Sequence, residues 1–281
     1  MWTQKIGISL GYGYNKPLSE VAEIVAKTGF DAISPAWKRG KELYELVNEA
    51  RARGLIIQSL HAPFTKSADM WRADEEKAKA AKAELMDALA DCAALDIPVM
   101  VCHTWIGFEY TDTPGEIGFK NYADVVARAT ELNVKIAFEN TEGEEFLFAL
   151  MDHFKGNPTV GFCWDSGHEM CYNHSKDLLA MYGDVLLMTH INDNLGISRF
   201  DGKTFWTDDL HLLPFDGIAD WSYNVERLKR SAHLDILNLE LTTASKPGRH
   251  DNDLYAAMPL EVYFAQAYQR ACRIANAYSR N

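Results

Sequence analysis

The sequence predicts a single α/β domain, a (β/α)8 barrel over residues 1–281, and three observations support this fold class. Short apolar runs alternate with helix-like stretches eight times along the chain, which is the pattern of an α/β protein. The apolar runs are nearly continuous, as expected for parallel strands that are buried on both faces. No Pro-, Gly- or Ser-rich linker divides the units, and 281 residues suit one barrel, although the length alone also allows two domains.

Eight apolar runs are the predicted strands. They cover residues 5–10, 30–34, 55–60, 99–102, 134–138, 159–164, 185–189 and 236–239. We expect Pro35 to stop the second strand and Pro98 to open the fourth, because proline marks strand boundaries. An open, doubly wound sheet is the alternative architecture. It would carry a Gly-rich phosphate-binding turn after the first strand, and Gly11-Tyr12-Gly13 is too weak a match for one.

A helical stretch follows each predicted strand. The predicted helices cover residues 19–29, 43–54, 73–95, 119–132, 144–154, 176–182, 223–232 and 259–277. In the first of them, Val21, Ile24 and Val25 have the spacing of one buried helix face. The third is rich in Ala, Lys and Glu, which have high helix propensity. A long irregular stretch, 192–218, separates the seventh strand from the helix that follows it.

Composition narrows the class of protein. The formal net charge of −12 argues against a nucleic-acid-binding surface, which needs clustered Lys and Arg. The five cysteines show no zinc-finger or CxxC spacing and are typical of a reducing compartment. The chain begins a strand almost at once, and no apolar run approaches 18 residues. These features predict a cytoplasmic protein that binds neither membranes nor nucleic acid.

Six of the eight predicted strands are followed directly by a residue that can bind a metal or transfer a proton. These residues are His61, His103, Glu139, Asp165, His190 and Glu240. In a (β/α)8 barrel the carboxyl ends of the strands meet on one face, where active sites are built. One such residue is commonly a helix cap or a satisfied polar group. Six at equivalent positions instead predict a functional site.

The donor types in this set indicate a divalent cation. Neighbouring carboxylates repel one another, and a bound cation removes that repulsion. Three carboxylates and one imidazole, those of Glu139, Asp165, His190 and Glu240, suit manganese best, with magnesium, cobalt or zinc as alternatives. The absence of cysteine from the set disfavours a structural zinc site.

The strand-end motifs, taken in order, resemble those of the xylose isomerase-like barrel superfamily of sugar-phosphate isomerases and epimerases. The motifs span nearly the whole chain: Leu60-His61-Ala62-Pro63-Phe64, Cys102-His103-Thr104, Phe138-Glu139-Asn140-Thr141, Asp165-Ser166-Gly167-His168, His190-Ile191-Asn192-Asp193-Asn194, His211-Leu212-Leu213-Pro214-Phe215-Asp216-Gly217 and Leu239-Glu240. Each motif is weak alone, and their order is specific for the superfamily but not for a substrate.

The resemblance implies roles for these residues. In the ketose 3-epimerases of this superfamily one metal is bound by residues that correspond to Glu139, Asp165, His190 and Glu240, and the two glutamates are also the acid/base pair. The residue corresponding to His168 contacts the substrate. These epimerases also have an arginine six residues after the metal-binding histidine, whereas this chain has Gly196 there and its nearest arginine is Arg199.

The expected reaction is isomerisation or epimerisation of a sugar, keto-sugar or sugar phosphate through an enediolate. Glu139 and Glu240 would transfer the protons, and the predicted substrate contacts are His61, His103, His168, His211 and Trp105. The same chemistry with a hydroxyl positioned to leave would make the protein a dehydratase of an inosose- or dehydroshikimate-like substrate. The expected partner is a small sugar or polyol, and the chain could form a homo-oligomer.

A second branch of the superfamily, the three-zinc AP endonucleases, is the less favoured alternative. These enzymes share the strand ends and add an Asp-x-His motif, which Asp209-Leu210-His211 matches. The resemblance then implies nine ligands: His61, His103, Glu139, Asp165, His168, His190, Asp209, His211 and Glu240. The acidic charge and the few basic residues in the early loops argue against this alternative.

Overall fold

The structure is a computed structural model that describes residues 4–11, 14, 16–198 and 202–280. Its strands are short and almost wholly buried. They are β1 (Lys5–Leu10), β2 (Ala32–Pro35), β3 (Ile56–Ile57), β4 (Leu60–His61), β5 (Val99–His103), β6 (Lys135–Glu139), β7 (Val160–Asp165), β8 (Leu186–His190) and β9 (Ile236–Leu239). Pro35 lies within β2 and not beyond it, where it pairs with Leu10 of β1.

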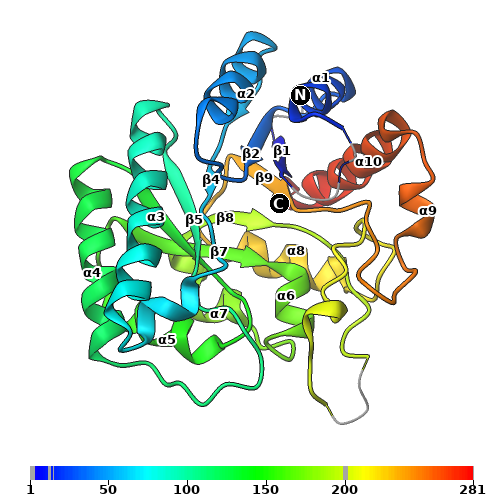
Figure 1. Cartoon of the computed structure of the whole chain (residues 1–281). Coiled ribbons are helices and arrows are strands. Elements are labelled where there is room, and N and C mark those ends of the chain that lie inside the picture. The colour runs from blue at the N-terminus through cyan, green and yellow to red at the C-terminus, as the bar shows by residue number, and fades with distance from the viewer. Residues whose placement is uncertain (1–3, 12–13, 15, 199–201, 281) are drawn as a thin grey trace.

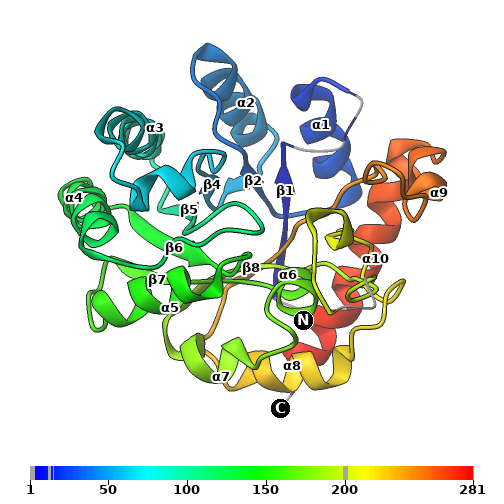
Figure 2. The ribbon, with the colours of Figure 1, turned by 60° about the horizontal axis from the view of Figure 1, so that its bottom comes forward.

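All the strand pairs are parallel, and they close into a barrel. One run of strands has the order β3-β2-β1-β9 and the other β4-β5-β6-β7-β8. The two runs join through a parallel bridge between Ala36 and His61 and another between Ile191 and Leu239. The predicted (β/α)8 barrel is therefore confirmed, and Figure 2 shows the helices arranged around it.

The third predicted strand, 55–60, differs from the structure because it forms two short strands with different partners. Its first part, β3, pairs with β2, and its second part, β4, pairs with β5. The amide of Gln58 still donates to the carbonyl of Ile33, whereas the amide of Ala62 donates to that of Val101. The chain therefore changes its pairing partner midway, and this change links the two halves of the barrel.

The helices cover the outside of the barrel (Figure 1). They are α1 (Leu18–Thr28), α2 (Lys41–Ala52), α3 (Glu75–Ala94), α4 (Glu116–Glu131), α5 (Glu144–His153), α6 (Ser166–Cys171), α7 (Leu178–Tyr182), α8 (Trp221–Lys229), α9 (Asp253–Ala256) and α10 (Leu260–Tyr278). Short 3-10 turns form η1 (Ser67–Trp71), η2 (Gly183–Val185) and η3 (Trp206–Asp208). Within the described ranges, no helix has both the length and the apolar character needed to cross a bilayer.

A layer of apolar side chains fills the barrel directly below the strand-end residues. Val101, Ala137, Cys163 and Met188 are fully buried and form a cluster separate from the main core. Each lies two residues before a strand-end residue, on β5, β6, β7 and β8 respectively. Because side chains two apart in a strand share a face, the strand-end side chains lie on the same inner side.

Candidate metal centre

Four strand ends bring one histidine and three carboxylates together. Candidate ligand atoms of Glu139, Asp165, His190 and Glu240 all lie within 4.8 Å of one another. Glu139, Asp165 and His190 end β6, β7 and β8 and are fully buried, while Glu240 follows β9 and is 8% exposed. The Nδ1 atom of His190 lies 2.8 Å from Glu139 Oε1 and 3.2 Å from Glu240 Oε2. We name these four residues the quartet.

Two further histidines approach the outer oxygen of Glu139. The Nε2 atoms of His61 and His103 both lie 3.3 Å from Glu139 Oε2. His61 donates its Nδ1–H to the carbonyl of Ala62, so its Nε2 faces the carboxylate. Glu139 therefore belongs both to the quartet and to a second group that could hold a cation, which it forms with His61 and His103.

The electrostatics of the quartet show how closely its charges are coupled. Burial would raise the pKa of Glu139, but His190 and His103 outweigh it and hold that pKa well below its usual value. Burial would also raise the pKa of Glu240, but the nearby imidazole of His190 outweighs burial and lowers that pKa to about 2. Burial raises the pKa of Asp165 to about 6, with Glu139 and Glu240 adding to the shift and His168 opposing it. Adjacent carboxylates thus have pKa values shifted in opposite directions, which is typical of functional sites.

The Asp165-Ser166-Gly167-His168 motif has a structural explanation for every residue. Asp165 caps α6 by accepting the His168 amide at 2.7 Å. Ser166 bonds the backbone of Asn192, and the Nδ2 of Asn192 donates to both Asp165 oxygens at 3.1 and 2.9 Å. A Cβ on Gly167 would lie only 1.9 Å from Asn192 Oδ1, so glycine lets this amide reach the carboxylate.

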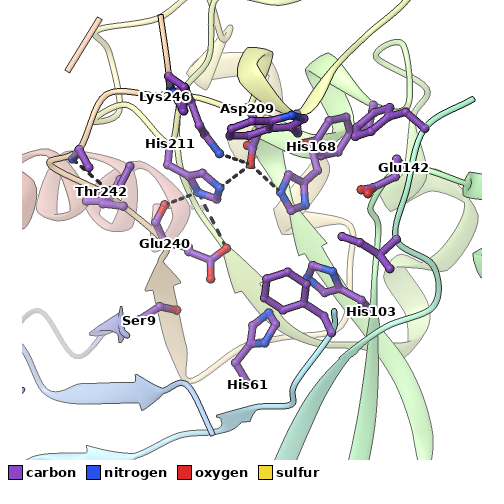
Figure 3. Close-up of a pocket in the computed structure, with 18 of the residues that line it drawn as sticks. Ser9, His61, His103, Glu142, His168, Asp209, His211, Glu240, Thr242 and Lys246 are labelled. Carbon is purple, nitrogen blue, oxygen red and sulfur yellow. Dashed lines mark hydrogen bonds and ion pairs between the residues drawn. The ribbon is translucent and has the colours of Figure 1, made fainter. Parts of the chain in front are cut away.

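Helix α6, which begins at Ser166, was not predicted, and it places His168 in a third group with Asp209 and His211. Nε2 of His211 lies 2.8 Å from Asp209 Oδ2, and Nε2 of His168 lies 3.5 Å from the same oxygen. Both imidazoles donate Nδ1–H to a backbone carbonyl, of Glu240 for His211 and of Asn140 for His168. These bonds orient the rings as they do in metal-binding histidines. We name His168, Asp209 and His211 the trio (Figure 3).

Asp209 and His211 lie in the long irregular stretch between β8 and α8, and hydrogen bonds to Asp193 hold that stretch in place. The buried carboxylate of Asp193 accepts the amides of Asn194, Phe215 and Ala219 and the indole N–H of Trp221, at 2.8 to 3.0 Å. Backbone bonds in both directions between Asp193 and Leu212 add a small antiparallel bridge. The described parts of this stretch, 192–198 and 202–218, are therefore tied to Asp193 at both ends.

A cavity of about 660 Å³ opens above the metal centre. Four of the five residues predicted to contact the substrate line it, namely His61, His103, His168 and His211, together with Glu240. Its other walls contain several aromatic and apolar side chains: Phe64, Ile106, Phe108, Tyr172, Trp206, Leu241 and Pro247. This combination of a polar base and apolar walls is usual for a small-molecule site.

Trp105 does not lie where the sequence predicts it. Its side chain is fully buried, its ring stacks on Phe146 at a centroid distance of 4.1 Å, and its Nε1–H donates to the Gly107 carbonyl. It is absent from the cavity lining, to which Gly107 and the neighbouring Ile106 and Phe108 contribute instead. Trp105 therefore supports the wall from behind, in contrast to the direct contact that was predicted.

Two charged residues that line the cavity, Glu142 and Lys246, were not among the predicted site residues. Glu142 is buried beside the cavity, accepts the Gly107 amide at 2.9 Å, and has its pKa raised by burial. Lys246, in the loop after β9, reaches Asp209 at 3.3 Å. Their signal in the sequence was only position, three and six residues after Glu139 and Glu240. Arg199, the arginine nearest the position held by Gly196, lies outside the described residues.

The residues of the quartet fit a divalent cation. Among the described residues, His190 Nε2 and Glu139 Oε2 are buried without a hydrogen-bond partner, as is Asp209 Oδ1 in the trio. Three buried carboxylates so close together need positive charge to be stable. Carboxylate oxygens with one imidazole suit manganese, magnesium, cobalt or zinc.

Solved structures share this fold. The structure of D-psicose 3-epimerase from Clostridium cellulolyticum H10 with D-tagatose gives a TM-score of 0.75 at 17% identity, covering 98% of this chain and 100% of that one. The IOLI protein with a binding zinc atom gives a TM-score of 0.76 at 18% identity, covering 99% and 100%. A structure of L-ribulose 3-epimerase gives a TM-score of 0.73 at 13% identity, covering 98% and 95%.

Sequence comparisons identify the family. The uncharacterized protein y4fM of Sinorhizobium fredii is 32% identical over 195 residues, which are 64% of this chain and 60% of that protein. The chain thus matches less than two thirds of the length of this relative. Residues 22–259 match the family model described as Xylose isomerase-like TIM barrel. With the barrel and its strand-end residues in place, the chain belongs to the xylose isomerase-like TIM barrel family.

Proposed function

We propose that this protein is a divalent-metal-dependent isomerase or epimerase that acts on a sugar, keto-sugar or sugar phosphate. The observation that carries the proposal is the quartet, in which two glutamates from different strand ends meet one aspartate and one histidine beneath the cavity. The similar structures of a D-psicose 3-epimerase and an L-ribulose 3-epimerase support the same class of substrate. The apolar walls suit the apolar faces of a sugar, and the histidines suit its hydroxyls.

The quartet would hold the cation, and manganese is our first choice. When bound, the cation supplies Lewis acidity to neighbouring oxygens of a hydroxy-carbonyl substrate. Glu240, which lines the cavity, would remove a proton from the carbon beside the carbonyl, and Glu139 would return one. His168 and His103 would donate hydrogen bonds to substrate oxygens, and His211 would orient the bound molecule.

Glu240→Gln tests the scheme. We expect turnover to fall at least ~100-fold, because the amide cannot accept the proton. The assay would follow a panel of ketoses and sugar phosphates with Mn²⁺ in heavy water by NMR, with bound metal counted in parallel. Glu226→Gln, an exposed glutamate of α8, is the matched control and should keep full turnover. Full turnover of a metal-loaded Glu240→Gln protein would show the two-glutamate scheme to be wrong.

The same assay separates the epimerase from the dehydratase. Exchange of a carbon-bound hydrogen for deuterium, without loss of water from the substrate, supports isomerisation or epimerisation. Loss of water from the substrate supports the dehydratase, which would use the same proton abstraction with a neighbouring hydroxyl as the leaving group. If no polyol, ketose or sugar phosphate reacts and none exchanges, the proposed class of reaction is wrong.

A metal-dependent phosphodiesterase is the second candidate, and the convergence of the nine residues favours it. Three of the five groups of described residues whose ligand atoms lie close enough to hold a cation together contain all nine residues: His61 with His103 and Glu139, the quartet, and the trio. Sites with several metal ions catalyse phosphodiester hydrolysis by stabilising the attacking and leaving oxygens. Cleavage of an abasic-site duplex by the zinc-loaded protein would support this candidate, whereas turnover of a sugar with one metal per chain would exclude it.

A further inference from the structure

The trio is built to hold a positive charge. Bonds to backbone carbonyls turn Nε2 of both His168 and His211 toward the same oxygen of Asp209. These three ligand atoms lie within 4.8 Å of one another, and Asp209 Oδ1 is buried without a hydrogen-bond partner in the described part of the chain. Geometry alone would therefore admit a divalent ion.

A cation from the chain already reaches this cluster. Lys246 Nζ lies 3.3 Å from Asp209 Oδ2, the oxygen that both imidazoles face, and only 21% of the lysine side chain is exposed. Its ammonium group also lies 5.9 Å from the centre of the Trp206 ring. Figure 3 shows Lys246, His211 and His168 converging on Asp209.

The loop that carries Lys246 is hydrogen-bonded to the segment that contains Asp209 and His211. The side-chain amide of Asn252 donates to the carbonyls of Leu210, Thr242 and Ala244. The hydroxyl of Ser245, next to the lysine, donates to Asp253. Leu210 lies between Asp209 and His211, so the lysine and its carboxylate partner are fixed to each other through the backbone.

We propose that Lys246 acts as an internal cation that replaces a divalent ion at the trio. Asp209 is the single carboxylate of the trio, and an ammonium and a divalent ion sharing its oxygen would repel each other strongly in this buried position. A metal therefore competes with Lys246 for the trio but not for the quartet. His168 and His211 then remain available to contact substrate. This inference concerns metal binding and does not depend on the proposed reaction.

Metal counting on the intact protein tests the proposal. Wild type, Lys246→Met and Lys246→Arg would be incubated with Zn²⁺, desalted, and analysed for zinc per chain, with folding checked by circular dichroism. We expect Lys246→Met to hold one more zinc per chain than wild type, and Lys246→Arg, which keeps the charge, to match wild type. Lys38→Met, an exposed lysine outside the cavity, is the control and should also match wild type.

Asp209→Asn assigns the extra zinc. In the Lys246→Met background it should remove the additional equivalent, and in the wild-type background it should leave the count unchanged. The proposal is overturned if Lys246→Met holds no more zinc than wild type. It is equally overturned if Asp209→Asn alone lowers the wild-type count by one, because the trio would then hold a metal despite Lys246.

Discussion

Asn192 shows how a residue that is not a ligand determines the geometry of the metal centre. Its amide donates to both oxygens of Asp165, and its backbone is fixed by the Ser166 hydroxyl. The Asn192 amide thus decides how the carboxylate faces the quartet. Groups that orient ligands in this way are commonly as important as the ligands themselves.

At this scale we predict the effect of Asn192→Ala. Metal affinity should fall roughly 10- to 100-fold, the usual cost of removing a group that orients a ligand. Isothermal titration of the metal-free protein with Mn²⁺ measures the change. Asn276→Ala, an exposed asparagine of α10, is the control and should bind with wild-type affinity. Unchanged affinity in Asn192→Ala would mean that Asp165 needs no such support.

At the scale of an element, one buried carboxylate, that of Asp193, ties together the two ends of the loop between β8 and α8. The four donors that converge on Asp193 come from both ends of the loop and from the start of α8. A Cβ on Gly217 would lie 2.1 Å from Asp193 Oδ1, so the packing around the carboxylate is tight as well. The position of Asp209 and His211 follows from this arrangement.

Asp193→Ala should therefore destabilise the protein by about 3 kcal/mol or more, since each buried donor left without a partner costs roughly 1–3 kcal/mol. Urea unfolding measures the free energy, and Asp184→Ala, an exposed aspartate in η2, should change it little. We also expect the variant to keep the metal of the quartet, because the quartet comes from strand ends. Loss of that metal would show that the loop supports the whole site.

At the scale of the whole molecule, the metal centre and the stability of the barrel are linked. The three carboxylates of the quartet come from β6, β7 and the end of β9, so their repulsion acts between strands. A cation bound there joins these strands, and it binds the folded state because the unfolded chain does not assemble the ligands.

We predict that Mn²⁺ raises the melting temperature. At a hundred times its Kd the ion adds about 2.7 kcal/mol, which corresponds to a rise of about 5–10 °C in a domain of this size. Differential scanning calorimetry with and without EDTA measures the rise. His190→Ala, which removes one ligand, should show a clearly smaller shift. An equal shift in both proteins would place the stabilising ion elsewhere.

Much of the fold was predictable because parallel strands buried on both faces leave a strong local signal. The predicted runs 134–138 and 236–239 match β6 and β9 almost residue for residue. The division of 55–60 into two strands was not predictable, because it reflects which neighbour each part pairs with. The short helix α6 was missed for a different reason, since its six residues are too few to show a helical period and its N-cap, Asp165, was interpreted only as a metal ligand.

The sequence by itself determined the barrel and the convergence of the strand-end residues. Once eight parallel strands close, their carboxyl ends must meet, so residues such as Glu139, Asp165 and His190 come together whatever the loops do. Only the tertiary structure decided which loop side chains face the cavity. Trp105 turns into the core against Phe146, while Lys246 turns toward Asp209. Loop side chains take their direction from contacts distant in sequence, and no local pattern encodes those contacts.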